Sequence, residues 1–164
     1  MFSNLSLLTS ILTVLLLSLV PSFEGRYALV IGIAMGLHPL LSFTIASLGI
    51  VILSLLVPRL IEYIDQLIRK LGKRSSLKSI ASMYFNYLNR VRRKVKPYVD
   101  RYGFIGLVIF VALPIPGSGI WTGSIAGYVL GFEKKKEVPA LILGGMLSNL
   151  ITLLTALGSA VILD

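Results

Sequence analysis

Two charged residues lie alone in the apolar first third of the chain. Glu24 and Arg26 are the only charged side chains among residues 1–58. Glu24 could take up and release a proton, because removal from water favours a neutral carboxyl group, although a neighbouring arginine opposes this. Arg26 stays charged and could hold an anionic group such as a phosphate. Because a charge inside a membrane is costly unless it is paired or hydrated, we expect a functional pair. The alternatives are an ion pair that only tethers the chain and a short external loop.

A second candidate stretch, "PIPGSG" at residues 114–119, interrupts an apolar run late in the chain. The helix that starts near Ile120 should begin with backbone N–H groups that lack partners, and such N-termini attract anions. Ser118, Thr122 and Ser124 add hydroxyl groups. A proline kink that only aids packing is the alternative. The predicted substrate- or ion-binding residues are Glu24, Arg26, Pro114, Pro116, Gly117, Ser118, Gly119 and Thr122.

The composition is that of an integral membrane protein. The 164 residues are 55% hydrophobic, with a mean hydropathy of +0.88, which is more apolar surface than a soluble domain of this size can bury. The chain has no cysteine, and its single histidine and scattered carboxylates form no metal-ligand cluster, so no metal or cofactor is expected. Without a nucleophile–base arrangement or a phosphate-binding glycine loop, no enzyme activity is predicted. Asn149, in the last apolar block, is interpreted as a packing residue.

The lengths of the apolar segments predict two hairpins that enter the membrane without crossing it. A helix needs about 20 residues to span a hydrocarbon core of about 30 Å. Residues 40–57 and 138–163 approach or exceed this length, whereas segments beside the Gly/Pro interruptions, such as 27–37, are about half as long. We therefore expect re-entrant hairpins at 5–37 and 103–132, each followed by a span. A plain bundle in which every apolar block crosses is the alternative.

Charge placement gives this arrangement a direction. Of the 16 Lys and Arg residues, 12 lie in residues 59–101 and three at 134–136, so the hairpin topology places 15 on one side of the membrane. The positive-inside rule makes this side cytoplasmic and places both termini outside. Nucleic acid also attracts basic segments, but membrane topology explains the pattern more simply, and no nucleic-acid partner is predicted.

The basic segment 59–101 is predicted to form amphipathic helices on the cytoplasmic side. Apolar residues and tyrosines recur there at three- and four-residue steps and are flanked by basic residues, which suits the headgroup layer of an anionic leaflet. A helix that covers the protein's own cytoplasmic face, or that pairs with a second copy, fits the same pattern. The predicted lipid-facing basic residues are Arg90, Arg92, Arg93, Lys94 and Lys96.

The two halves of the chain resemble each other weakly. Residues of the first half match residues of the second half 91 to 93 positions later: Pro21 with Pro114, Glu24-Gly25-Arg26 with Gly117-Ser118-Gly119, and Gly32 and Gly36 with Gly123 and Gly127. Interrupted short segments at corresponding places indicate an inverted-repeat transporter. The predicted fold is one all-α integral membrane domain, residues 1–164. Its two inverted repeats (1–58 and 102–164) are each a re-entrant hairpin plus one transmembrane helix, joined by the cytoplasmic amphipathic helices.

The stretches "FEGRYALVIGIAMG" and "FVALPIPGSGIWTGSIAGYVLG" resemble the small multidrug export protein family of prokaryotic membrane proteins, which is similar to the DedA/VTT superfamily. The resemblance covers most of the chain apart from residues 59–100. It implies re-entrant hairpins, inverted repeats and transport, with lipid translocation or proton coupling in the wider superfamily, and it fixes no cargo. Ile50 departs from the family pattern, in which an asparagine is expected, so no polar role is carried over to this position.

The residues and the resemblance together predict a membrane transporter, either a proton- or ion-coupled exporter or a lipid translocator. Its site would lie at mid-membrane between the Glu24–Arg26 tip and the Pro114–Gly119 tip. The expected partners are membrane lipids, an anionic or lipid substrate and protons, and the small membrane body is compatible with a homodimer. The alternative is a membrane scaffold that presents the basic segment 59–101 to lipid or to a partner.

Overall fold

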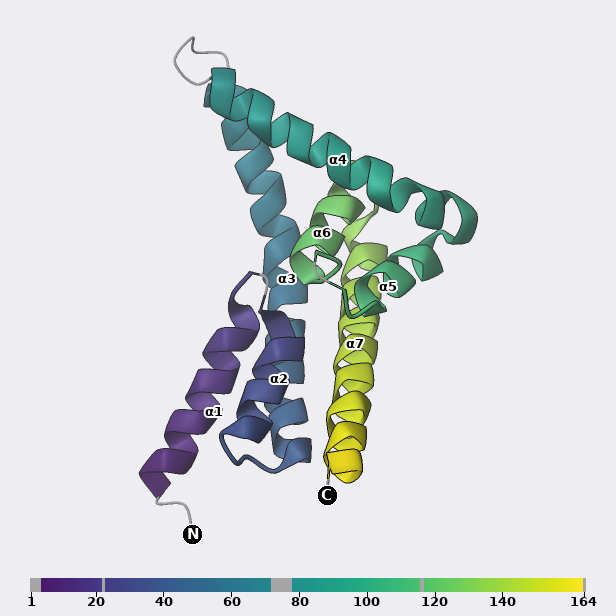
Figure 1. Cartoon of the computed structure of the whole chain (residues 1–164). Coiled ribbons are helices and arrows are strands. Elements are labelled where there is room, and N and C mark those ends of the chain that lie inside the picture. The colour runs from purple at the N-terminus through teal and green to yellow at the C-terminus, as the bar shows by residue number, and fades with distance from the viewer. Residues whose placement is uncertain (1–3, 22, 72–77, 116, 164) are drawn as a thin grey trace.

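The computed structural model describes residues 4–21, 23–71, 78–115 and 117–163. Within these ranges all regular structure is helical, as predicted (Figure 1). The helices are α1 (Asn4–Leu19), α2 (Glu24–Ala34), α3 (Pro39–Leu71), α4 (Lys78–Tyr102), α5 (Phe104–Ala112), α6 (Ile120–Val129) and α7 (Lys134–Leu163).

In the described part of the chain, α3 and α7 are the two helices that are long and apolar enough to cross a membrane. They contain 33 and 30 residues, or about 50 and 45 Å, against a hydrocarbon core of about 30 Å. Helices α2, α5 and α6 contain 11, 9 and 10 residues and reach about 17 Å at most. Helix α1 is apolar but has only 16 residues. The two predicted spans are therefore matched by α3 and α7.

Helices α3 and α7 run in opposite directions through the middle of the molecule (Figure 1). The first helix pair, α1 and α2, packs on α3, whereas in the second helix pair α5 packs along α7 and α6 packs on α3. The α1–α2 and α5–α6 connections both lie near mid-height. The start of α1 and the end of α7 lie at one end of the molecule, and α4 crosses the other end.

Buried apolar side chains hold these helices together in two clusters. One cluster surrounds Phe110, Ile120 and Leu141 and includes residues of α3 to α7. The other lies between α1, α2 and α3 and includes Leu153 of α7. Small residues allow the closest approaches: a Cβ at Gly144 of α7 would lie 2.7 Å from Val111 of α5. Close backbone packing of this kind is typical of helices in membranes.

The turns that end α2 and α6 are built alike. Gly36 and Gly131 have positive φ angles of 84° and 75°. The amide that follows each glycine donates to the carbonyl of Gly32 or Gly127, at 3.0 and 2.9 Å, which is the Schellman pattern. The two turns are 95 residues apart, whereas the predicted repeat pairs residues 91 to 93 positions apart. The α1–α2 and α5–α6 connections differ in length (residues 20–23 and 113–119), which accounts for the difference in spacing.

Two predicted boundaries also differ from the structure. Helix α3 continues through Pro58, so the predicted span 40–57 and the first part of the predicted linker form one helix. A proline removes one helical hydrogen bond, but Val57 and Ile61 beside it are buried in the core, and their packing favours the continued helix. Helix α7 begins at Lys134, ahead of the predicted start of the span at 138, so the basic "KKK" at 134–136 forms its first turn. Within the basic segment 59–101 the sequence "GKRSS" at 72–76 predicts a break between two amphipathic helices, and this stretch lies outside the described residues.

Candidate functional site

Glu24 is the first residue of α2, and its side chain reaches the second helix pair. The residue is 7% exposed and has a φ of +51°, which is unusual for a residue other than glycine. Its carboxylate accepts hydrogen bonds from the backbone N–H groups of Ile120 (3.1 Å) and Trp121 (3.3 Å). These are the first two residues of α6. Glu24 therefore caps the N-terminus of a helix in the other pair, where a negative charge is stabilised.

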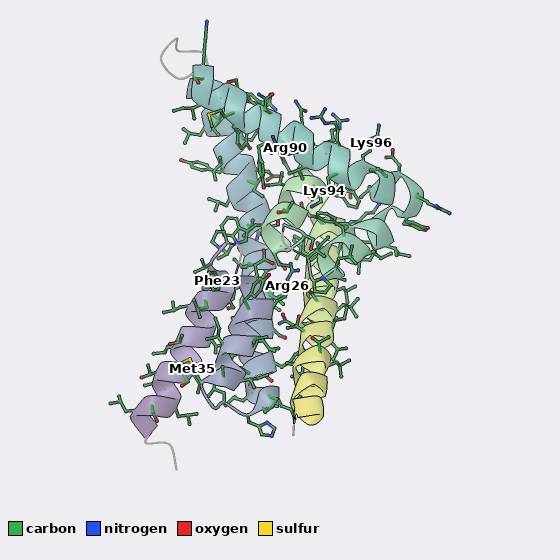
Figure 2. All side chains as sticks on the ribbon, in the orientation of Figure 1. Phe23, Arg26, Met35, Arg90, Lys94 and Lys96 are labelled. Carbon is green, nitrogen blue, oxygen red and sulfur yellow. The ribbon has the colours of Figure 1, made fainter. Side chains whose placement is uncertain are left out.

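Arg26 makes the complementary contact at the end of α5. It is buried, and its Nη1 donates to the carbonyls of Leu113 (2.9 Å) and Ile115 (3.2 Å). Its Nη2 lies 3.4 Å from Glu24 Oε2. A positive charge is favourable at a helix C-terminus. Arg26 thus binds the C-terminal end of α5 and Glu24 binds the N-terminal end of α6, on the two sides of the interruption. Figure 2 shows Arg26 in the middle of the molecule.

The "PIPGSG" stretch has the shape that this contact requires. Ser118 is buried, its hydroxyl donates to the Ile115 carbonyl (2.8 Å), and its Oγ lies 3.5 Å from Arg26 Nη1. At Gly119, an added Cβ would overlap the Glu24 carboxylate. Only glycine at position 119 lets the carboxylate reach the first turn of α6.

The structure brings together four of the predicted binding residues, namely Glu24, Arg26, Ser118 and Gly119. Gly117 and Thr122 line the cavity beside them, Pro114 is exposed in the interruption, and Pro116 lies outside the described residues. One expectation was wrong. The N–H groups at the start of α6 do not lack a partner, because the carboxylate of Glu24 accepts from them.

A cavity of about 140 Å³ lies beside the Glu24–Arg26 pair. Tyr27, Tyr87 and Trp121 contribute to its wall, and Trp121 Nε1 is buried without a hydrogen-bond partner. Because sites for drug-sized ligands occupy about 300–1,000 Å³, this state has room only for a small group. Sequence reasoning missed Tyr87, since nothing in its local pattern indicates that α4 reaches the α5–α6 connection.

A much smaller cavity, about 10 Å³, lies on the α7 side of the pair. Ser148 and Asn149 line it, and Ser148 Oγ and Asn149 Oδ1 are buried without hydrogen-bond partners. An added Cβ at Gly25 would lie 2.7 Å from Asn149 Oδ1. Asn149 therefore packs directly against the tip that carries Glu24 and Arg26. A polar side chain in an apolar span was the sequence signal for this position.

A family model described as "Putative small multi-drug export protein" matches residues 24–151. The match starts at Glu24 and includes the interruption that Glu24 and Arg26 close. The chain belongs to this family. Searches of curated proteins and of solved structures return no match. Membership of the multi-drug export family, together with the two long apolar helices, indicates that this chain is a membrane protein.

This family member has two further polar clusters toward its α4 end. Asp65 is 1% exposed, accepts a hydrogen bond from the Tyr128 hydroxyl (2.6 Å) and pairs with Arg69. Glu137 is fully buried and pairs with Lys134 (2.9 Å). Sequence reasoning singled out neither carboxylate, because both lie in segments rich in charge. Across the part of the chain that the structure describes, no group of three or more His, Cys, Asp or Glu side chains could hold a metal ion.

All five basic residues predicted to face lipid are exposed on α4, and Figure 2 labels three of them. Arg90, Arg92 and Arg93 line an open groove of about 540 Å³. Lys94 Nζ lies 5.9 Å from the ring centre of Phe110, and Lys96 pairs with an aspartate at 3.9 Å. Their contact with lipid stays a prediction.

Proposed function

We propose that this protein is a membrane transporter, an exporter as its family description states, and that the Glu24–Arg26 contact is its gate. The observation that carries the proposal is the buried pair itself. Two charged side chains of the first helix pair bind the end of α5 and the start of α6 in the second pair, next to a cavity. Ionisable groups inside a membrane are costly and commonly mark transport pathways.

Protonation of Glu24 is the proposed trigger. The carboxylate holds the start of α6 through two N–H groups and lies 3.4 Å from the Arg26 guanidinium. A neutral carboxyl group loses its attraction to the helix N-terminus and to the arginine, and hydrogen bonds to an ionised group are about twice as strong as neutral ones. The two connections could then separate, and the cavity of about 140 Å³ would widen. Proton uptake would thereby be linked to movement of the cargo.

We also propose that each helix pair is re-entrant and that the two halves are inverted repeats. The matching turns at Gly36 and Gly131 and the opposite directions of α3 and α7 support this proposal. The lengths of α5 and α6 support it as well, because neither helix alone can cross a bilayer. With the basic α4 end in the cytoplasm, both termini face outside.

A reconstitution assay tests the gate. The purified chain is placed in lipid vesicles under an imposed pH gradient, with ethidium as a cationic drug probe and a fluorescent phospholipid as a second probe. We expect Glu24→Gln to lower the proton-driven rate by about tenfold or more, because the amide cannot take up a proton and the imposed pH gradient can then no longer switch the contact. Glu133→Gln is the matched control, since Glu133 is an exposed acid outside the contact, and its rate should equal that of the parent.

The two probes also distinguish the candidate functions. Movement of ethidium supports an exporter, whereas movement of only the fluorescent lipid supports a lipid translocator with the same gate. If Glu24→Gln moves either probe at the parent rate, the Glu24–Arg26 gate is wrong. If the parent moves neither probe faster than empty vesicles do, the scaffold alternative is favoured.

A further inference from the structure

A groove of about 350 Å³ lies beside α4, away from the Glu24–Arg26 pair. Arginines from two helices line it, Arg69 from the end of α3 and Arg92 from α4. Phe85, Asn89 and Tyr128 complete its polar and aromatic wall. We call this feature the arginine groove. We propose that the arginine groove binds the phosphate headgroup of an anionic lipid, as a site separate from transport.

The Arg69 side chain is held in place by groups behind it. Its Nε donates to the carboxylate of Asp65, which is 1% exposed and also accepts from the Tyr128 hydroxyl at 2.6 Å. Its guanidinium carbon lies 5.1 Å from the centre of the Phe85 ring. The Arg69 side chain itself is still 61% exposed. An arginine fixed at one edge and open at the other is well suited to bind a phosphate, because its planar fork matches the phosphate oxygens.

The surrounding charge favours an anion. Arg92 makes no ion pair with any residue that the structure describes, and together with Arg90 and Arg93 it also lines the adjoining groove of about 540 Å³. The acid nearest to Arg69, Asp65, is already paired. Burial and the Asp65 charge raise the pKa of Tyr84 to about 12, so this neighbouring phenol adds no negative charge at neutral pH. Net positive charge therefore remains at the arginine groove.

The position of the groove along α3 favours a lipid over a soluble anion. Arg69 lies 30 residues after Pro39, the start of α3, which corresponds to about 45 Å along the helix. A bilayer has a hydrocarbon core of about 30 Å and measures about 40–45 Å with its headgroups. If α3 starts near one surface, Arg69 lies at the headgroup layer of the opposite leaflet. A phosphate there is covalently part of the membrane, and its local concentration is high.

The test is lipid binding by the full chain in detergent, measured by native mass spectrometry. Phosphatidylglycerol is titrated against phosphatidylcholine for the parent, Arg92→Gln and the matched control Arg101→Gln. Arg101 lies on the same helix, is exposed and does not line the arginine groove. We expect Arg92→Gln to weaken phosphatidylglycerol binding by about tenfold. Arg101→Gln should change it by about twofold or less, because an exposed charge outside the site acts only through screened electrostatics.

Two further arms complete the experiment. Tyr128→Phe, which removes the hydroxyl that helps to fix Asp65 and Arg69, should lower the preference for phosphatidylglycerol without changing phosphatidylcholine binding. Inorganic phosphate added at the same concentration as the lipid should displace little of it. Equal losses in Arg92→Gln and Arg101→Gln, no loss in Arg92→Gln, or efficient displacement by inorganic phosphate would each overturn the proposal. None of these results depends on whether the protein transports ethidium or lipid.

Discussion

Glu24 can cap α6 only because residue 119 has no side chain. A Cβ at Gly119 would occupy the space of the Glu24 carboxylate, so Gly119→Ala should push this carboxylate away from Ile120 and Trp121. We expect a loss of about 2 kcal/mol or more in the free energy of unfolding, since charge-assisted hydrogen bonds to a buried group are removed. Unfolding in detergent, followed by circular dichroism, measures the change.

Gly158→Ala provides the matched control for this substitution. Gly158 lies in α7, where an added Cβ meets no atom within 4 Å, so alanine there should be neutral or slightly stabilising. If Gly119→Ala and Gly158→Ala unfold alike, the Glu24 contact contributes little to the stability of the folded chain.

At the same scale, the sequence indicated the candidate residues but not their partners. Glu24 and Arg26 could be found because they are isolated charges in an apolar region, and Ser118 and Gly119 because they interrupt a helix. The hydrogen bond from the Ile120 N–H to the Glu24 carboxylate could not be predicted. The two residues are 96 positions apart, and their contact depends on how the helix pairs pack. Asn149 and Tyr87 join the site for the same reason.

At the scale of helices, the ends of α2 and α6 depend on left-handed glycines. Gly36 and Gly131 have φ angles of 84° and 75°, and a Cβ in this conformation costs about 1–2 kcal/mol. We expect Gly36→Ala and Gly131→Ala to lower the free energy of unfolding by similar amounts in this range. Asparagine tolerates the conformation better, so Gly36→Asn and Gly131→Asn should cost less than alanine at either position. Thermal unfolding of the four variants measures the order, and an asparagine variant less stable than its alanine counterpart would contradict the assignment of these turns.

Helix positions were largely predictable from apolar length and from Gly/Pro interruptions, whereas some helix ends were not. The interruption at "PIPGSG" separates α5 from α6 as expected, because two prolines and two glycines within six residues strongly disfavour a continuous helix. The predicted span 40–57 stops before Pro58, but there the buried neighbours Val57 and Ile61 outweigh one lost hydrogen bond. Local sequence therefore determines where a helix ends when several prolines and glycines occur together. Tertiary packing determines it when a single proline lies in an apolar helix face.

At the scale of the whole molecule, the opposite directions of α3 and α7 decide which segments would share a side of the membrane if both helices cross it. The turn before α3 lies at the same end as the start of α1, and α4 crosses the opposite end (Figure 1).

His38, Arg90 and Lys135 are exposed, and the native chain has no cysteine, so single cysteines can be introduced at these positions without background labelling of the parent chain. With a membrane-impermeant maleimide on intact cells, we expect His38→Cys to be labelled, and Arg90→Cys and Lys135→Cys to react only after the membrane is opened. The reason is the excess of Lys and Arg around the last two positions, which favours a cytoplasmic location by the positive-inside rule. If positions 38 and 90 react from the same side, α3 does not cross the bilayer, and Glu24 would then lie in a surface loop where its charge needs no partner.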